Sequence, residues 1–391
     1  MFKTIILTVD EETLVKAGKS ILLHEISFQP LIKWIINATS NSEKHIIISD
    51  GCTEQLRVVL GDSAEYAEQK AGSDIVNSLI SAKPHLENFK GDVFVIRGNT
   101  PLILSETINA AYEFHVKSGN YLTVLSSIEH DNVSISKFKF KTDYNMFFMN
   151  LNFFANFLKS DSTDIDEFIN GNSNKIGSYV INDSEEFAVT NNIQLAKAQF
   201  MMNSRIVRKH LLNGVTFLSP ETAYIGKDVE IGIDTIIMPN TIIKGKTKIG
   251  SKCIIGANTQ ITDSVIDDNV EINSSVILES SVGKNTKVGP FAYIRPNSKI
   301  GENIKIGDFV EIKNSNIGDG TKLSHLTYVG DGVLSGRGLH GHGPVGGDQT
   351  VAPVTPSDGS VVPHLLGESG DGQVVDIVVD VVTGVDLELE V

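Results

Sequence analysis

The sequence is poor in cysteine and lacks long hydrophobic runs. Its two cysteines, Cys52 and Cys253, lie in different segments and form neither a disulfide framework nor a CxxC metal motif, so we expect a reducing, cytoplasmic compartment. The apolar run at the N-terminus is short and ends at Asp10, which is unlike a signal peptide. No stretch approaches the roughly 18 apolar residues of a membrane helix, so we expect no membrane partner.

Basic residues are also fewer than acidic residues. The chain has 33 lysines and arginines against 48 aspartates and glutamates, which gives a formal net charge of −15. A broad acidic field repels a phosphate backbone, so we expect no nucleic-acid partner, although a locally basic pocket can still bind a small anion. With 391 residues, 41% of them hydrophobic, the chain has the size and composition of a soluble protein of two or three domains.

Short apolar runs alternate with helical patterns in the first part of the chain. The predicted strands are Thr4–Val9, His45–Ser49 and Asp92–Arg97, and the predicted helices are Leu31–Ala38, Ile75–Ala82 and Glu106–Lys117. Such alternation is typical of a mostly parallel sheet with helices packed on it. We therefore predict an α/β domain over residues 1–190.

One long amphipathic pattern follows this domain. It covers Asn192–Leu212 and ends at Asn213 and Gly214, residues that commonly terminate helices. We predict a linking helix within residues 191–214.

From Ile225 onward, aliphatic residues recur every six positions. The period slips briefly after Ile261, resumes at Val282, and loses one residue again before Ile317. The in-phase residues are Ile225, Ile231, Ile237, Ile243, Ile249, Ile255, Ile261, Ile266, Ile272, Ile277, Val282, Val288, Ile294, Ile300, Ile306, Ile312, Ile317, Leu323 and Val329. A triangular coil of three short parallel strands has this period, whereas an α-helix or a flat strand does not. We predict a left-handed parallel β-helix of hexapeptide repeats over residues 215–331, in preference to a β-sandwich with coincidental isoleucines.

Glycine, asparagine and aspartate occur between many of these aliphatic residues. We expect small residues of this kind at the corners of the coil, where the backbone needs a positive φ. A single coil cannot bury its aliphatic residues alone, so several coils must stack.

Residues 332–391 differ in composition from everything before them. From Asp331 to the end there is no lysine, asparagine or aromatic residue, and Arg337 is the only arginine. We expect a disordered acidic tail, while a segment of other origin and a shifted reading frame remain open alternatives. Its histidines, His340, His342 and His364, lack rigid surroundings that could hold a metal, so we predict no metal site.

The run VGPFAYIRPNSKIGENIKIGDFVEIKNSNIGDGTKLSHLTYVGD, residues 288–331, closely resembles a known family. It is similar to the acetyltransferase domain of the bacterial bifunctional N-acetylglucosamine-1-phosphate uridyltransferase/glucosamine-1-phosphate acetyltransferases. The likeness extends backwards through NGVTFLSPETAYIGKDVEIG and, more weakly, GDVFVIRGNTPLI. It implies a Rossmann-like, nucleotidyltransferase-like fold for the first domain. The tail shows no such resemblance.

The resemblance also implies a site for an amino-sugar phosphate in the β-helix. By motif match, His325 is the general base that takes the proton of the attacking amine. Arg295 and Lys313 match the pair that binds the sugar phosphate, and Tyr328 matches a residue that lines the sugar site. Eighteen residues, one full coil, separate the two cations, so we expect one above the other. The alternative is that all four are ordinary surface residues.

The donor half of this site is where the chain departs from the family. In the family, the sequence continues after the motif into further coils that complete the acetyl-CoA pocket and hold the thioester oxyanion. Here the Gly-rich tail follows Asp331. Loss of one oxyanion donor costs roughly 10²–10³ in rate, so we expect acetyl transfer to be impaired.

For the first domain the resemblance implies a nucleotidyl-transfer site that binds UTP and Mg²⁺. The family's Gly-rich phosphate loop aligns with residues 7–15, where Asp10 and Glu12 replace glycines. Its magnesium-binding aspartate aligns with Asn99, and its second metal ligand aligns near Thr190. Two carboxylates repel phosphate, and an amide lacks the charge that a hard cation favours. We predict that uridylyl transfer is lost.

These observations favour an acetyl-CoA-dependent glucosamine-1-phosphate N-acetyltransferase of UDP-N-acetylglucosamine biosynthesis. The family resemblance implies a homotrimer. Two alternatives stay open: a non-catalytic trimeric pseudoenzyme that binds a sugar nucleotide or another subunit, and a fully bifunctional uridyltransferase/acetyltransferase.

Overall fold

A computed structural model of the chain describes residues 2–8, 20–49, 51–69, 75–127, 145–159, 165–172, 175–334, 366–368 and 374–376. Internal contacts divide the chain into two units, Met1–Lys209 with Tyr224–Lys227, and His210–Ala223 with Asp228–Val391. Within the described ranges, no helix is long and apolar enough to cross a membrane.

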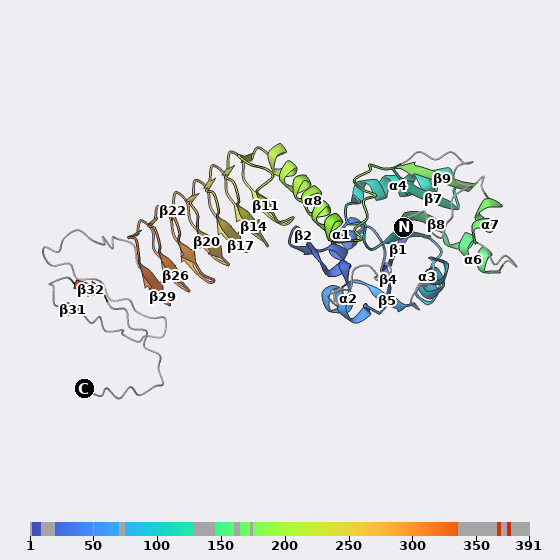
Figure 1. Cartoon of the computed structure of the whole chain (residues 1–391), viewed down its shortest axis with the longest axis horizontal. Coiled ribbons are helices and arrows are strands. Elements are labelled where there is room, and N and C mark those ends of the chain that lie inside the picture. The colour runs from blue at the N-terminus through green and yellow to red at the C-terminus, as the bar shows by residue number, and fades with distance from the viewer. Residues whose placement is uncertain are drawn as a thin grey trace, which may run out of the picture. The chain divides into compact units, whose positions relative to one another are not determined.

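A seven-stranded sheet forms the centre of the first unit (Figure 1). In spatial order its strands are β5 (Glu65–Glu68), β4 (His45–Ser49), β1 (Phe2–Leu7), β6 (Asp92–Arg97), β8 (Met146–Asn150), β7 (Leu122–Ser126) and β9 (Ile176–Val180). Neighbouring strands are parallel, except that β8 runs antiparallel to β6 and β7. The parallel order β5-β4-β1-β6 is that of one half of a Rossmann-like sheet, which confirms the predicted fold class.

Helices cover both faces of this sheet. They are α1 (Leu31–Ala38), α2 (Thr53–Leu60), α3 (Ile75–Ala82), α4 (Ser105–Ser118), α6 (Leu151–Lys159), α7 (Ile165–Asn170) and α8 (Asn192–Leu212), with short 3-10 helices at Ile21–Leu23, Gly61–Ser63 and Lys83–Leu86. The strands β2 (Glu25–Ile26) and β3 (Gln29–Pro30) form a small separate hairpin. The predicted bounds of α1, α3 and α8 are confirmed.

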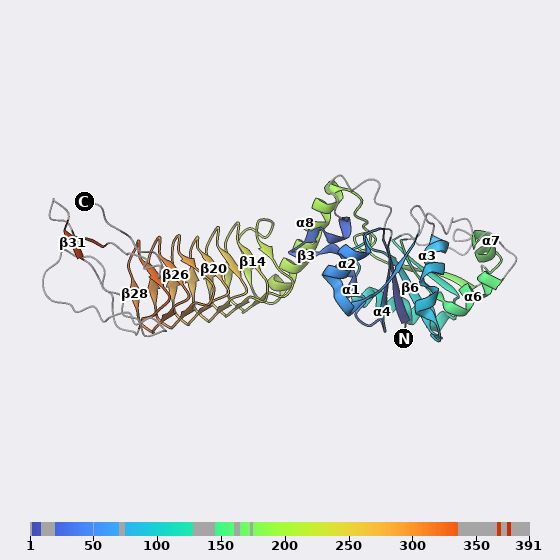
Figure 2. The same cartoon turned by 90° about the horizontal axis from the view of Figure 1, so that it is seen from below.

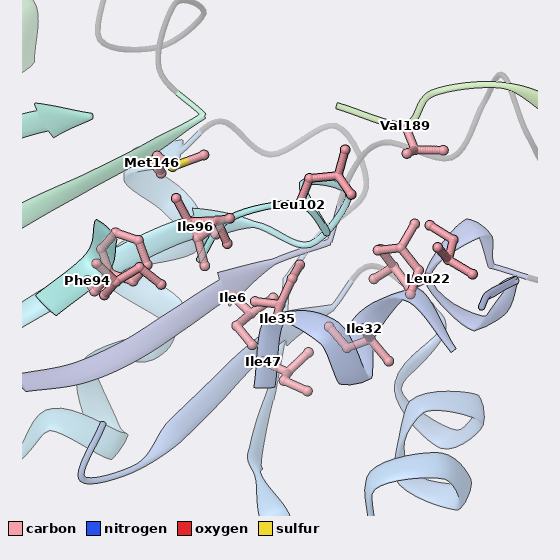
Figure 3. Packing of buried hydrophobic residues seen from close by; sticks show 14 of the residues in the cluster. Ile6, Leu22, Ile32, Ile35, Ile47, Phe94, Ile96, Leu102, Met146 and Val189 are labelled. Atoms are coloured by element: carbon pink, nitrogen blue, oxygen red, sulfur yellow. The ribbon is translucent and has the colours of Figure 1, made fainter. Parts of the chain in front are cut away.

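The core of the first unit lies in two layers, because successive strand residues point to opposite faces. In β1, Ile6 packs into one layer with residues of α1, α4 and α8. Its neighbour Ile5 packs into the other layer with residues of α3 and α6. Figure 3 shows the first layer, in which Ile32 and Ile35 of α1 face Ile6 and Ile47 of the sheet.

A parallel β-helix follows, built from three seven-stranded sheets (Figure 2). The first sheet contains β10 (Thr216–Phe217), β13 (Ile236–Ile237), β16 (Ile254–Ile255), β19 (Glu271–Ile272), β22 (Lys287–Val288), β25 (Lys305–Ile306) and β28 (Lys322–Leu323). The second contains β11 (Tyr224–Ile225), β14 (Ile242–Lys244), β17 (Gln260–Thr262), β20 (Val276–Leu278), β23 (Tyr293–Ile294), β26 (Glu311–Lys313) and β29 (Tyr328–Gly330). The third contains β12 (Glu230–Ile231), β15 (Lys248–Ile249), β18 (Val265–Ile266), β21 (Ser281–Val282), β24 (Lys299–Ile300), β27 (Asn316–Ile317) and β30 (Val333–Leu334).

The aliphatic residues that defined the six-residue period are all buried, and together with the three parallel sheets this confirms the predicted hexapeptide β-helix. Where the period slips, the coil is shorter but the core stays aligned. Ile243 pairs with Ile261 eighteen residues on, whereas Ile261 pairs with Ile277 after only sixteen. The strands therefore keep their register, and the short coils lose their residues from the connections between strands.

The corners of the coil use positive φ as predicted, but not always with small residues. Asparagine and aspartate hold many of these positions, as at Asn285. At one corner of the last coils, however, Phe291, Phe309 and Leu326 adopt φ values of 60°, 55° and 57°. A bulky side chain is strained there. The rings of Phe291 and Phe309 stack with centroids 5.2 Å apart, a contact that offsets part of this cost.

The first residues of the predicted tail form β30, which pairs with β27 in the third sheet. Beyond it, the structure describes two short strands of the tail, β31 (Leu366–Glu368) and β32 (Val374–Asp376), which pair antiparallel. The predicted disorder of the tail otherwise concerns residues outside the described part.

Candidate functional site

The two predicted cations lie on successive coils of the second sheet. The strands β23 and β26 pair Tyr293 with Glu311 and Ile294 with Ile312. The next residue, Arg295, donates its backbone N–H to the carbonyl of Ile312, immediately before Lys313, at 2.8 Å. The predicted spacing of one coil is therefore confirmed. We call the outward side of this sheet at Arg295, Lys313 and Tyr328 the cation face.

Each cation of this face is paired with a carboxylate. Arg295 Nη1 lies 2.9 Å from Glu311 Oε1, and this hydrogen bond is the main cause that raises the pKa of the guanidinium. Lys313 Nζ lies 3.0 Å from Asp331 Oδ2, and this bond together with the carboxylate charge raises the ammonium pKa. Hydrogen bonds from Asn314 and then Lys313 lower the pKa of Asp331. Both cations are therefore held in the charged form.

Tyr328 begins β29, one coil after Glu311, with which it pairs. Tyr328 is 40% exposed, and the strand register places it beside Glu311, the partner of Arg295, and two residues before Gly330, which pairs with Lys313. The ring rests on the backbone of Gly330, where an added Cβ would lie 2.7 Å from the phenol oxygen. Glycine is thus needed at position 330 for this ring position.

His325 lies apart from the cations, at the corner between β28 and β29. The cations lie toward the far end of the second-sheet strands. His325 is exposed, and the structure describes no residue that forms a hydrogen bond or ion pair with its ring. The next residue, Leu326, has positive φ and its N–H donates to the carbonyl of Asp308 at 3.0 Å, which fixes the turn. The structure thus brings together Arg295, Lys313 and Tyr328, and places His325 at the other edge of the same sheet.

Glu311, Asp331 and Asn314 are site residues that the sequence analysis did not single out. A signal was present, because Glu311 follows Arg295 by sixteen residues and Asp331 follows Lys313 by eighteen. Each offset is close to one coil, which is eighteen residues from Ile294 to Ile312 and seventeen from Ile312 to Val329. Opposite charges one coil apart on an outward position are expected to pair.

Asn99, which aligns with the family's magnesium-binding aspartate, connects two segments of the first unit through hydrogen bonds to Val189. Asn99 is 2% exposed. Its side-chain Nδ2 donates to the backbone carbonyl of Val189 at 3.2 Å, and its backbone carbonyl accepts the Val189 N–H at 2.8 Å. Its Oδ1 is buried without a hydrogen-bond partner. Thr190 bonds through both N–H and hydroxyl to the side chain of Gln194, whose own N–H donates to Asn191 Oδ1.

The hydrogen-bond partners that the structure describes for Asn99 and Thr190 are all neutral groups. Mg²⁺ is usually held through carboxylates, so these residues do not fit the ion. Asp10 and Glu12 lie outside the described residues. Among the residues described, no group of three or more His, Cys, Asp and Glu side chains could hold a metal. The tail histidines His340, His342 and His364 also fall outside that part.

A hollow of about 360 Å³ lies elsewhere, on the third sheet in the first coils of the β-helix. Its lining includes Glu230, Lys248 and Asp268 and none of the predicted site residues. It is open and far along the coil from Arg295, so we assign no chemistry to it.

Comparisons with known proteins agree with this architecture. Residues 228–263 and 279–314 match the family model of the bacterial transferase hexapeptide (six repeats). The chain is 37% identical to the bifunctional protein GlmU of Acetivibrio thermocellus, over 84% of this chain and 79% of that protein. It is 30% identical to the bifunctional protein GlmU of Streptococcus pyogenes serotype M12, over 84% and 87% respectively. The chain belongs to the GlmU family. It is accordingly a transferase, and its second matched block contains Arg295 and Lys313.

Proposed function

We propose that this GlmU-family chain N-acetylates glucosamine-1-phosphate with acetyl-CoA, in the biosynthesis of UDP-N-acetylglucosamine. The observation that carries the proposal is the cation face, where Arg295 and Lys313 lie on successive coils beside Tyr328. The bifunctional relatives and the hexapeptide match support it. As in the family, we propose a cytoplasmic homotrimer.

The cation face suits the acceptor's phosphate. A phosphate monoester carries about two negative charges near neutral pH, with several oxygens able to accept hydrogen bonds. The guanidinium of Arg295 uses one donor for Glu311 and keeps others for a planar, two-pronged contact, while Lys313 supplies a compact charge. The phenol of Tyr328 borders the sugar.

His325 is the proposed general base. The acceptor would lie across β29, a strand of three residues or about 10 Å, from the cations toward the His325 corner. His325 takes a proton from the amine, whose nitrogen then forms a bond to the thioester carbon. The C–S bond breaks, and the thiolate of coenzyme A leaves with the electron pair and takes up a proton. The ring is exposed and forms no hydrogen bond with a described residue, so a substrate amine can reach it, as this role requires.

We propose further that both activities of the family are reduced here. The stretch after Asp331 does not resemble the family's donor-binding coils, so acetyl transfer would be slow rather than absent. In the first unit, an amide that bonds Val189 stands at Asn99 in place of a charged Mg²⁺ ligand, so uridylyl transfer would be lost. The second candidate is a fully bifunctional enzyme, favoured by the name that the curated relatives carry.

The test is an assay of the purified full chain for thiol release from acetyl-CoA with glucosamine-1-phosphate. His325→Ala should lower kcat by about 10²–10⁴, the usual contribution of a general base. Lys313→Ala should mainly raise KM for the sugar phosphate. Lys305→Ala is the matched control, since Lys305 is an exposed lysine on the neighbouring first sheet. Turnover that is indifferent to His325→Ala would rule out the assigned base, and UTP-dependent formation of UDP-N-acetylglucosamine would establish the bifunctional alternative.

A further inference from the structure

The two carboxylates of the cation face are held very differently. Glu311 makes a single side-chain contact, to Arg295, at the end of a long and half-exposed side chain. Asp331 is short, and both of its oxygens are engaged. Its Oδ2 accepts from Lys313 Nζ at 3.0 Å, and its Oδ1 accepts from Asn314 Nδ2 at 2.9 Å.

The backbone of Asp331 is also fixed. Its N–H donates to the carbonyl of Lys313 at 2.9 Å, so main chain and side chain both bond the same lysine one coil below. Its φ of 48° places it at a corner, a conformation that aspartate and asparagine tolerate better than most residues. Asp331 is therefore a rigid group attached to Lys313 at two points.

Such a pair does little for the stability of the fold. The side chains of Lys313 and Asp331 are 41% and 53% exposed, and ion pairs that exposed are largely screened by water. What the contact does change is the freedom of Lys313, since a lysine has four rotatable bonds and its ammonium otherwise samples many positions. One of three ammonium donors is used, and two remain for a ligand.

We propose that Asp331 is a positioning residue of the acceptor site, which holds the Lys313 ammonium at the cation face so that it meets the phosphate without first being ordered. This inference rests on the proposed function. Glu311 differs, because its one contact and flexible stem let it leave Arg295 when a dianion arrives. Asp331 stays in place, because Asn314 holds its second oxygen.

The test is a double-mutant cycle on the full chain with Asp331→Ala, Lys313→Ala and the double variant, plus Asp331→Asn. Binding of glucosamine-1-phosphate is measured by calorimetry without acetyl donor, so slow turnover does not limit it. Freezing one flexible side chain is worth about three- to tenfold in affinity, so Asp331→Ala should weaken binding by that factor. In the Lys313→Ala background, Asp331→Ala should change affinity less than about twofold. Glu230→Ala, which breaks a similar pair with Lys248 one coil apart, is the matched control and should have no effect.

Two results would overturn the inference. One is independence, in which the effects of Asp331→Ala and Lys313→Ala multiply. The other is tighter binding by Asp331→Asn, which would show a carboxylate that merely competes with phosphate. Asp331→Asn tolerates the positive φ, so it keeps the test open if Asp331→Ala misfolds.

A second readout separates this inference from the proposed function. Reductive methylation of Lys313, followed by mass spectrometry, should be slow relative to Lys305 and should speed up in Asp331→Asn. If the wild type binds no sugar phosphate, the proposed function fails, while this comparison still tests whether Asp331 holds the Lys313 ammonium in place. Equal methylation rates for Lys313 in both proteins would reject it.

Discussion

Replacing Asn99 by aspartate tests whether the first unit lacks a Mg²⁺ site only because of this residue or is built around the asparagine. The side chain is 2% exposed and its Nδ2 is a hydrogen-bond donor to the Val189 carbonyl. Asn99→Asp restores the residue type that the family places there. It also removes the donor and buries a carboxylate against a carbonyl oxygen.

The magnitude follows from these two changes. Leaving the Val189 carbonyl unsatisfied costs about 1–3 kcal/mol, and an uncompensated buried charge brings the total to about 3–5 kcal/mol near neutral pH. Burial raises the folded-state pKa of the new carboxyl above its unfolded value of about 3.9. Below that value the protonated acid can donate to Val189 and the cost is small. As pH rises toward the folded pKa, the free energy of unfolding should fall by about 1.4 kcal/mol per pH unit.

Urea denaturation followed by tryptophan fluorescence, repeated at several pH values, measures this free energy of unfolding. Trp34 is the only tryptophan of the chain; it lies in α1, packs against the first-unit core and donates to the Ile26 carbonyl at 2.9 Å, so its signal reports the first unit. Asn99→Ala is the control, because it loses the hydrogen bond but titrates no group and should show no added pH dependence. Stabilisation of Asn99→Asp above the wild type by about 10 mM Mg²⁺, where binding to the folded state raises stability, would refute the reasoning. Recovery of UTP turnover would do the same.

Three further predictions follow from single contacts. Ile312→Ala removes a fully buried side chain from the β-helix core and should cost about 2–5 kcal/mol, measured by denaturation followed by circular dichroism; a loss under about 1 kcal/mol would contradict a packed core. Burial alone would raise the pKa of Asp92, but hydrogen bonds from His115, Asn150 and Tyr112 and the charge interaction with His115 together lower it. This carboxylate therefore stabilises the first unit above its unfolded pKa, and the contribution is lost as pH falls through the folded pKa. Asp92→Asn should flatten this part of the acid-unfolding profile, and an unchanged profile would assign the acid sensitivity elsewhere. Gly330→Ala should push the Tyr328 ring from its place and raise KM for the sugar phosphate several-fold, while an unchanged KM would remove Tyr328 from the acceptor site.

The sequence by itself determined the β-helix and the spacing of its cations. A six-residue repeat sets where each inward side chain falls on a coil, and coils stack only on their neighbours, so the pattern is local information. Arg295 and Lys313 are eighteen residues apart, and that distance alone places them on successive coils. The alternating runs of the first unit likewise predicted β4 and β6 with their observed bounds, because side-chain periodicity is local too.

Only the tertiary structure decided what these side chains contact. Asn99 binds Val189, ninety residues along the chain, and no periodicity predicts such a pair. Coils of sixteen to eighteen residues leave open which outward carboxylate meets which cation. The side-chain positions in the folded coils decide for Glu311 with Arg295 and for Asp331 with Lys313. Burial and ion pairing depend on atoms brought together from distant parts of the chain, whereas the coil itself depends on the order of residues within one turn.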